Sequence, residues 1–301
     1  MHNHTVMKAH TAYLPVLLLA ILLFVGCNQP SDTESNNQQT VTYTDDYGSA
    51  VEIPLHPQRI VSTSPAVTEI IFALGGADLL VGRTDFCVYP PEAKQITSIG
   101  GISNLNIERI VSLDPDLVSS GSMIPKKSTV QLEKMGVPTV CVIEQLRYEG
   151  LYENISKIGR LIGRTEAADS LNALLRDRLK QLDVQTTAQP KSVYYVVGFG
   201  ASGNFTAGGD SFINDIIRLA GGRNIAEDIS GWSYSLEKLM QQNPEYIVIR
   251  KEDSAAFCRM APYNQLQAVK SGRVIAIESS LIDLQVPRNT EAIQFLFDRL
   301  H

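Results

Sequence analysis

The feature that most constrains the fold of this chain is an alternation of short β-branched runs with amphipathic helical patterns. The run Arg59-Ile60-Val61-Ser62 is followed by apolar residues at helical spacing from Ala66 to Leu74, and Gly75-Gly76 closes that pattern. Parallel strands need crossover connections, and these are usually helices. The alternation therefore predicts an α/β fold with parallel sheets.

The same alternation occurs in both halves of the chain. In the first half, strands are predicted at 59–62, 80–82, 117–118 and 138–143, with helices at 66–74, 107–113 and 127–135. In the second half, strands are predicted at 192–197, 246–249 and 273–277, with helices at 210–220, 236–241, 264–269 and 289–300.

Between the halves lies a stretch that is helical almost throughout, from Leu151 to about Val184. Two apolar stripes at helical spacing run along it, and Gly163 between them is the expected point for a break or kink. A long helical stretch between two α/β halves predicts a stiff connector, which we place at 148–187.

Two motifs recur in the same order in each half. Glu69–Gly76 matches Asp215–Gly222, and the Glu108 and Glu237 motifs each precede a Pro-acid pair by seven residues (Pro115-Asp116 and Pro244-Glu245). This repetition predicts two lobes of similar design, at 41–147 and 188–301. The expected ligand site lies between their facing strand ends.

The N-terminal residues indicate export. Lys8 is followed by an apolar run from Tyr13 to Val25, which is shorter than the ~20 residues needed to cross a bilayer and is typical of a signal peptide at 1–26. Cys27 follows a small residue, as in a bacterial lipobox; the alternative is an ordinary cleaved signal with an incidental Cys. The polar stretch after Cys27 favours a lipidated tether at 27–40. Either Met1 or Met7 could be the start.

Composition argues against several classes of function. The net charge is −6 with no basic patch, so we expect no nucleic-acid partner. After the signal peptide the histidines are His56 and His301, and there is no GxSxG, so neither a catalytic residue nor a metal site is predicted. An exported enzyme that uses the cleft between the lobes remains the alternative. Gly198–Gly203 fits GxGxxG, but no helix starts at its third glycine, which indicates a loop instead of a dinucleotide site.

Three cysteines remain besides Cys27, namely Cys87, Cys141 and Cys258. Their odd number leaves at least one free thiol. A Cys87–Cys258 bridge and unpaired thiols are both open at this point.

Two acidic residues occupy matching places, each in the first turn of a short predicted helix. Glu108 follows Asn106 and Glu237 follows Ser235, which are suitable N-cap residues. One interpretation is that the carboxylates complement the helix dipole. The other is a matched pair, one per lobe, that docks on arginines of a partner.

Aromatic residues gather on predicted loops at strand ends. They are Phe86, Tyr89, Phe199, Phe205, Trp232, Tyr234 and Tyr263. Core packing explains any one of them, but together they are what a pocket for a flat apolar ligand needs.

Several of these segments resemble one family, the substrate-binding proteins of ABC importers for ferric siderophores, haem or cobalamin. The resemblance runs from about Gln58 to the C-terminus, and the segments that carry it are Ser64–Glu69, Tyr89–Ala93, Asn106–Val118, Phe205–Gly208 and Trp232 ahead of the Glu237 helix. Within the family, Phe86-Cys87-Val88-Tyr89-Pro90-Pro91 is most similar to the cobalamin binders.

The resemblance implies a class III periplasmic binding protein, with two Rossmann-like lobes joined by a single long helix. It implies a monomeric, non-enzymatic lipoprotein on the periplasmic side of the envelope, which delivers its ligand to an inner-membrane permease dimer with its ATPase. It also implies that Glu108 and Glu237 dock on permease arginines.

Cobalamin is the ligand that the resemblance favours, with a ferric siderophore or haem as alternatives. The side chains expected to bind it are Phe86, Tyr89, Phe205, Trp232, Tyr234, Tyr263 and Arg288. A haem iron would take Tyr89, Tyr234 or Tyr263, and an anionic siderophore would take Arg83, Arg147, Arg259 or Arg288.

Overall fold

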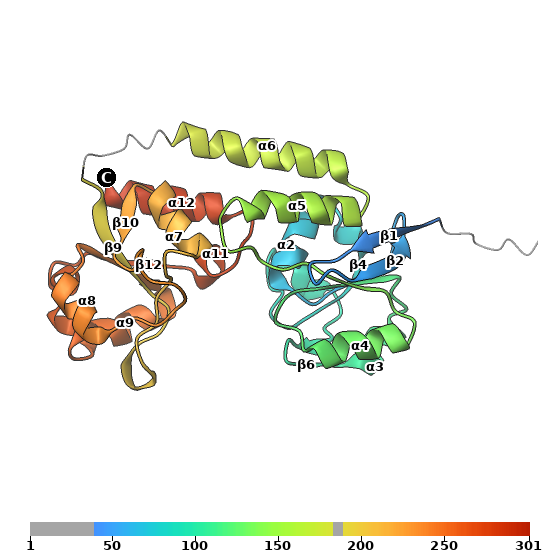
Figure 1. Ribbon diagram of the computed structural model, residues 1–301, viewed down its shortest axis with the longest axis horizontal. Helices are drawn as coiled ribbons and strands as arrows, with labels where there is room; N and C mark the ends of the chain where they lie inside the picture. Colours follow the sequence, from blue (N-terminus) through green and yellow to red (C-terminus); the bar gives the residue numbers. More distant parts are fainter. Residues whose placement is uncertain (1–38, 183–188) are drawn as a thin grey trace, which may run out of the picture. The chain divides into compact units, whose positions relative to one another are not determined.

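Two four-stranded parallel sheets with the same strand order form the centres of the two halves (Figure 1). The first contains, in spatial order, β4 (Leu80–Arg83), β3 (Ile60–Ser62), β7 (Leu117–Ser120) and β8 (Thr139–Cys141). The second contains β10 (Gly222–Asn224), β9 (Lys191–Val196), β11 (Tyr246–Arg250) and β12 (Val274–Ile277). The computed structural model describes residues 39–182 and 189–301. The α/β fold class is confirmed, and the repeated motifs correspond to a repeated topology.

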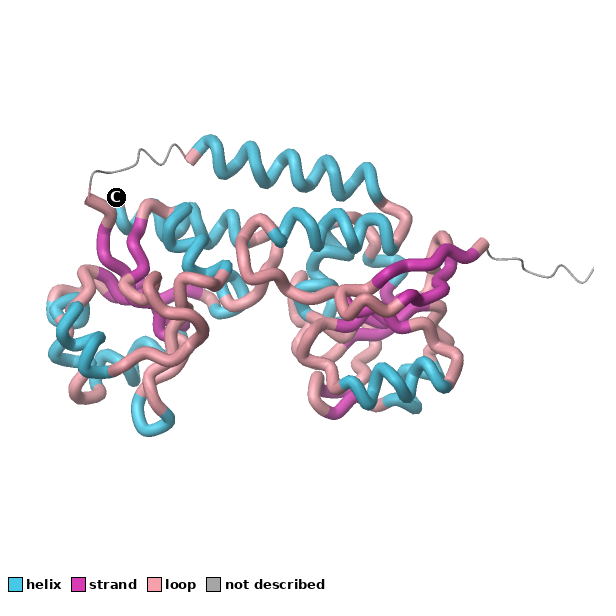
Figure 2. Tube along the Cα trace, in the orientation of Figure 1, coloured by secondary structure: helices cyan, strands magenta, loops and turns pink. Residues whose placement is uncertain are grey.

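Helices cover the sheets on either side of the strands (Figure 2). In the N-terminal lobe they are α2 (Pro65–Ala73), α3 (Ile107–Ser112) and α4 (Lys126–Lys134). In the C-terminal lobe they are α7 (Phe212–Leu219), α8 (Leu236–Gln242), α9 (Lys251–Arg259), α10 (Gln267–Lys270), α11 (Ser279–Ile282) and α12 (Asn289–Leu300). A short hairpin, β5 (Gly100–Gly101) with β6 (Asn104–Leu105), precedes α3.

The predicted connector at 148–187 contains two helices, α5 (Gly150–Leu161) and α6 (Thr165–Gln181), which lie side by side (Figure 1). Gly163 separates them with a φ of +69°, a left-handed conformation that favours glycine. The pair is antiparallel, because Ala168 of α6 lies against Gly159 of α5, whereas Asn172, one turn further along α6, donates to the Tyr152 carbonyl and the Ser156 hydroxyl, earlier in α5. α5 also packs against α2. The connecting helix is therefore α6 alone, while α5 belongs with the N-terminal lobe.

The segment before the first sheet is a β-hairpin that the sequence did not reveal, β1 (Thr40–Thr44) with β2 (Ala50–Pro54). Its turn is tied to the lobe, since Asp46 accepts from the Ile143 amide at 2.8 Å and from Lys157 Nζ at 2.6 Å. The signal peptide, Cys27 and almost all of the predicted tether lie outside the described residues. Within 39–182 and 189–301, no helix is long and apolar enough to cross a membrane.

Buried apolar side chains form three clusters, and the largest includes residues of both sheets. Val140 of β8, Ile155 of α5, Val193 of β9 and Ile293 of α12 all belong to it. Residues 39–301 accordingly form one compact unit.

Candidate functional site

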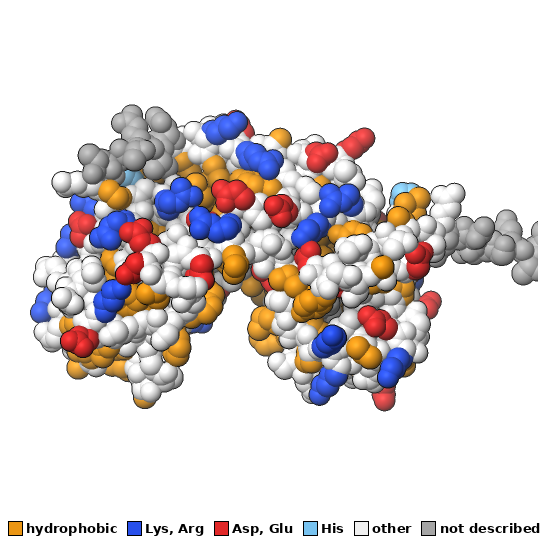
Figure 3. All heavy atoms as spheres, in the orientation of Figure 1, with side chains coloured by type: hydrophobic (Ala, Val, Ile, Leu, Met, Phe, Trp, Pro, Cys, Tyr) orange, Lys and Arg blue, Asp and Glu red, His pale blue; other side chains and the backbone are white. Residues whose placement is uncertain are grey.

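Three aromatic side chains are exposed on loops that follow the carboxyl ends of strands. Phe86 and Tyr89 follow β4 in the N-terminal lobe, and Trp232 lies in the loop that follows β10 in the C-terminal lobe. Their exposed fractions are 59, 39 and 49 per cent. Figure 3 shows the surface hollowed between the lobes, with hydrophobic side chains along both sides of the hollow. Carboxyl ends of parallel strands are the usual ligand sites of α/β sheets, so these aromatics are where a flat ligand would be met.

The Trp232 loop is tied to the segment that follows β9. The Thr206 amide donates to the Trp232 carbonyl at 2.8 Å, and the Gly208 amide donates to the Gly231 carbonyl at 2.9 Å. Asp210 accepts from the Gly231 amide at 3.0 Å and from the Ser230 hydroxyl. The Ser230 hydrogen bond, more than the Gly231 amide, holds the pKa of Asp210 below its ordinary value. Trp232 is therefore presented on a loop whose backbone is held by hydrogen bonds within the C-terminal lobe.

Two other predicted ligand residues, Tyr234 and Tyr263, lie in the core of the C-terminal lobe. They are only 4 and 2 per cent exposed. The Tyr234 hydroxyl donates to the Ile225 carbonyl at 3.1 Å, and the Tyr263 hydroxyl accepts from the Gly200 amide at 2.9 Å and donates to Asn204. Their placement differs from the expected cleft lining, because these hydrogen bonds satisfy both hydroxyls inside the lobe.

Phe205 is half-buried against the glycine-rich segment. A Cβ added at Gly198 would lie 3.1 Å from the Phe205 ring, so the ring occupies the space that glycine leaves. Gly200 and Gly203 have φ values of +85° and +111°. The segment from 198 to 203 is a loop with a single 3-10 turn, as its sequence predicts.

Arg288 connects the two lobes. Its Nε and Nη2 donate to the two carboxylate oxygens of Glu69 on α2, each at 2.8 Å. Its guanidinium carbon also lies 3.4 Å from the centroid of the Tyr89 ring. Burial raises the pKa of Glu69, and the Arg288 guanidinium opposes that rise.

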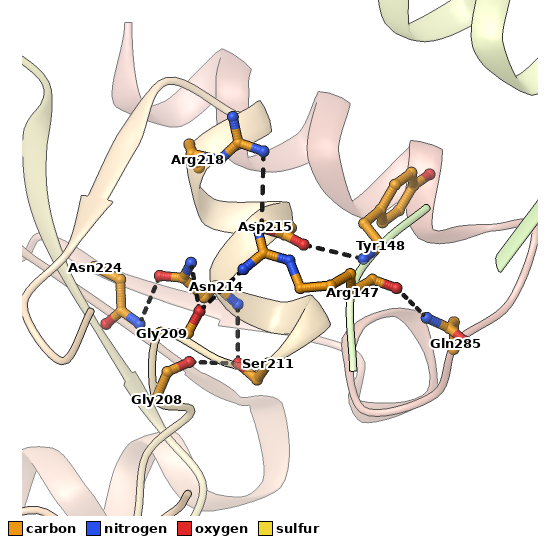
Figure 4. Close-up of polar contacts among 10 residues, drawn as sticks. All are labelled: Arg147, Tyr148, Gly208, Gly209, Ser211, Asn214, Asp215, Arg218, Asn224 and Gln285. Atoms are coloured by element: carbon orange, nitrogen blue, oxygen red, sulfur yellow. Dashed lines mark hydrogen bonds and ion pairs between the residues drawn. The ribbon is translucent and has the colours of Figure 1, made fainter. Parts of the chain in front are cut away.

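A second arginine makes an equivalent contact with the lobes exchanged: the arginine comes from the N-terminal lobe and the acid from the C-terminal lobe (Figure 4). Arg147, just before α5, donates to the Asp215 carboxylate on α7 at 2.6 Å. The Tyr148 amide donates to the other oxygen of Asp215 at 3.0 Å, and Asp215 is fully buried. Glu69 and Asp215 occupy matching positions of the sequence repeat. Each lobe therefore has a buried acid at this position, which pairs with an arginine of the other lobe.

Gln285 makes further contacts between the lobes. Its amide nitrogen donates to the Arg147 carbonyl at 2.9 Å, and its oxygen accepts from the Gln145 amide at 2.9 Å. This side chain was not predicted from the sequence, because nothing local marks a buried glutamine as an interface residue.

The other arginines considered for an anionic ligand differ in availability. Arg83 is buried and donates to three backbone carbonyls, those of Ala93, Thr84 and Lys94. Arg259 at the end of α9 is exposed. Three of the four candidates, Arg83, Arg147 and Arg288, are thus already engaged within the protein.

Glu108 and Glu237 occupy the same place in two copies of one structural module. Each is the second residue of its helix, after an N-cap side chain that accepts a backbone amide: Asn106 from Arg109 in α3, and Ser235 from Lys238 in α8. Both carboxylates are exposed. The predicted N-caps are confirmed, and the two acids are presented identically.

Other surface features carry less chemistry. Depressions of about 560 and 630 Å³ flank α6, but charged and polar side chains dominate their linings. Cys87, Cys141 and Cys258 form no disulfide among the residues that the structure describes. In the described ranges, no three His, Cys, Asp or Glu side chains lie together as metal ligands would.

The chain is similar in sequence to known proteins. Residues 60–281 match the family model described as periplasmic binding protein. An ABC transporter substrate-binding lipoprotein of Bacillus subtilis is 31% identical over 312 aligned positions, which cover 98% of each chain. A cobalamin-binding protein of Halobacterium salinarum is 30% identical, over 91% of this chain and 77% of its own.

Solved structures agree with the sequence relatives. A periplasmic haem-binding protein of Pseudomonas aeruginosa superposes with a TM-score of 0.73 at 26% identity, over 81% of this chain and 92% of its own. The chain therefore belongs to the periplasmic binding protein family, as a substrate-binding protein of the ABC importer type.

Proposed function

We propose that this protein captures a flat metal chelate of the corrinoid class between its lobes and delivers it to an ABC permease. The observation that carries the proposal is the set of exposed aromatics Phe86, Tyr89 and Trp232, which follow strand ends in both lobes. Aromatic rings fixed on both lobes suit a ligand with two large faces. The cobalamin-binding relative supports the corrinoid choice.

The placement of the arginines and tyrosines supports a corrinoid over haem and over an anionic siderophore. An anionic siderophore needs free cationic side chains, whereas Arg147 and Arg288 are already paired with carboxylates. A haem iron needs an accessible tyrosine, and of the three tyrosines considered only Tyr89 is exposed. Haem, bound through Tyr89, is therefore the second candidate ligand. The haem-binding structural relative supports this candidate.

Calorimetry on the purified domain would decide between the ligands. Cyanocobalamin, haemin and a ferric catecholate would be titrated separately into the same preparation. We expect saturable binding of cyanocobalamin; its absence, with binding of haemin or the catecholate instead, would transfer the proposal to that ligand.

We also propose that Glu108 and Glu237 dock on arginines of the permease. They are exposed, they lie one per lobe, and their backbones are fixed by the same N-cap contact. Exposed charges of this kind contribute steering and orientation more than raw affinity.

Uptake measurements with a matched control would test the docking. Glu108→Ala with Glu237→Ala should leave ligand affinity intact and abolish uptake. Glu166→Ala is the control, because Glu166 is likewise the exposed second residue of a helix, α6. Normal uptake by the double variant, or equal loss in the control, would refute the docking role.

The lipid on Cys27 belongs to the same proposal. Multiple acyl chains give stable membrane attachment where one gives marginal binding. A Cys27→Ser variant should therefore leave the membrane fraction while it keeps its affinity for ligand. Recovery of this variant with the membranes would argue against lipid anchoring.

A further inference from the structure

Tyr89 belongs to the N-terminal lobe, but a side chain of the C-terminal lobe holds its ring. The Arg288 guanidinium carbon lies 3.4 Å from the ring centroid, which is a stacked contact. The same guanidinium makes the bidentate pair with Glu69, at 2.8 Å on both arms. A fork-shaped pair of this kind fixes the guanidinium plane as well as its position.

The pair is also shielded from water. The side chains of Arg288 and Glu69 are 12 and 5 per cent exposed, whereas Tyr89 retains 39 per cent of its surface. The result is a layered arrangement: a buried carboxylate orients a buried guanidinium, and the guanidinium supports a ring that solvent can reach.

We propose that Arg288 and Glu69 are positioning residues for ligand capture, which hold Tyr89 as a preformed aromatic wall of the site. The inference rests on the proposed function for its ligand, a flat conjugated metal chelate. A ring that is already fixed loses little conformational freedom when a ligand covers it, so binding is tighter than to a mobile ring.

The repeated architecture supplies a matched control. Asp215 and Arg147 form the equivalent ion pair between the lobes, at 2.6 Å, in which the carboxylate is buried and the arginine is 53 per cent exposed. Among the cation–ring contacts of the described residues, the stack on Tyr89 involves Arg288 and none involves Arg147. Arg147→Met therefore weakens the join between the lobes without releasing Tyr89.

The first test needs no ligand. The full-length domain would be labelled with 3-fluorotyrosine, and the Tyr89 resonance would be assigned in the ¹⁹F spectrum with Tyr89→Phe. We expect Arg288→Met to shift and narrow this resonance, Glu69→Gln to shift it less, and Arg147→Met to leave it unchanged. An unchanged Tyr89 resonance in Arg288→Met would overturn the proposal.

The second test measures affinity for whichever chelate binds the wild-type protein. We expect about tenfold weaker binding for Arg288→Met, and no more than about a twofold change for Arg147→Met. With a corrinoid, Tyr89→Phe should stay close to wild type, because phenylalanine keeps the stacking face; with haem bound through the Tyr89 oxygen, the same variant should lose affinity. Equal affinity of Arg288→Met and wild type would overturn the positioning role.

The two tests separate this inference from the proposed function. If none of the chelates binds the wild-type protein, the proposed function fails, and the ¹⁹F measurement still decides whether Arg288 holds Tyr89. Should Arg288→Met not fold, Arg288→Lys replaces it: its ammonium can pair with Glu69 but offers no planar face. A wild-type Tyr89 resonance in Arg288→Lys would contradict the stacking role.

Discussion

At the scale of single residues, Glu69 and Asp215 show how one sequence position acquires two chemical environments. Asp215 is fully buried and receives the Tyr148 amide and Arg147, with Arg218 at 3.7 Å. Glu69 receives Arg288 on both oxygens. Burial nevertheless prevails at Glu69 and raises its pKa, because desolvation opposes the charged form more than one arginine favours it.

This shift predicts how stability changes with pH. A carboxyl group whose pKa is raised on folding contributes stability that is fully present below its unfolded pKa, about 4.3, and lost as pH rises through the folded pKa. Glu69→Gln removes the titration. We therefore expect the wild-type protein to lose stability relative to Glu69→Gln as pH rises from about 4 to 7.

Urea unfolding of both proteins across that range would measure the difference. Arg288→Met offers an internal check, since without the opposing guanidinium the wild-type trend should become steeper. Parallel stability curves for wild type and Glu69→Gln would show that Glu69 does not titrate as its burial implies.

Trp232 makes a second prediction at this scale. It is half exposed, so Trp232→Ala should change the free energy of unfolding by no more than about 0.5 kcal/mol. Aromatic contact residues at the centre of an interface often contribute more than 1 kcal/mol, so ligand affinity should fall by about tenfold or more. Trp232→Phe should lose less, because it keeps a smaller ring.

Calorimetry can follow all three proteins. Trp232 is also the single tryptophan of the chain, so its fluorescence reports ligand binding to the wild-type protein directly. Unchanged affinity in Trp232→Ala would assign Trp232 to the scaffold instead of the site.

At the scale of elements, the helices that carry Glu108 and Glu237 are two copies of one module. Each helix is followed by a residue with positive φ, Asp114 at 49° and Asn243 at 43°, and then by proline and an acid. The acid binds the start of the first strand of its sheet, since Asp116 accepts from the Arg59 amide and Glu245 accepts from the Ser192 amide. The module therefore ties each exposed glutamate to the central sheet.

The N-caps of this module should be measurable. Asn106→Ala and Ser235→Ala each remove a side-chain acceptor for a backbone amide, which costs about 1 kcal/mol. We expect each variant to lose about that much in urea unfolding and to bind ligand normally. Asn106→Asp is the control, because aspartate caps equally well; a loss as large as that of Asn106→Ala would show that the cap is not the cause.

Local signals explain which elements were predictable. α3 and α8 have a cap residue at the start and a proline just beyond the end, so sequence alone gives their bounds closely. α9 was missed because Lys251–Arg259 buries a single hydrophobic residue, Phe257, and shows no apolar stripe. β10 was missed because Gly222–Asn224 contains no β-branched residue and becomes a strand only by pairing with β9.

At the scale of the whole described unit, the contacts between the lobes join residues far apart in sequence. Glu69 and Arg288 are separated by 219 positions, and Gln145 and Gln285 by 140. No periodicity or spacing connects such pairs, which is why the sequence indicated Arg288 only as a ligand residue. The alternation of strands and helices predicted the α/β fold, while the contacts between the two halves depend on tertiary packing.

These contacts predict that the lobes keep a narrow range of relative positions. Arg147 with Asp215 and Arg288 with Glu69 bridge the lobes in opposite directions, and Gln285 binds the backbone between them. Breaking one buried pair leaves an uncompensated charge, so the join resists opening. Ligand binding should accordingly change the distance between the lobes very little.

Double electron–electron resonance between spin labels on the two lobes would measure that distance. Exposed positions on α4 and α9 (Lys127 and Ala255) can carry the labels, with Cys258→Ser to remove the most accessible native thiol. We expect a narrow distance distribution. Ligand binding should shift its mean by less than the width of the distribution. Arg147→Met with Arg288→Met should broaden it, whereas Lys157→Met, which breaks the Asp46 pair inside the N-terminal lobe, should not. A broad wild-type distribution, or a ligand-driven shift larger than its width, would show a working hinge and would mean that the two arginine bridges do not hold the lobes together.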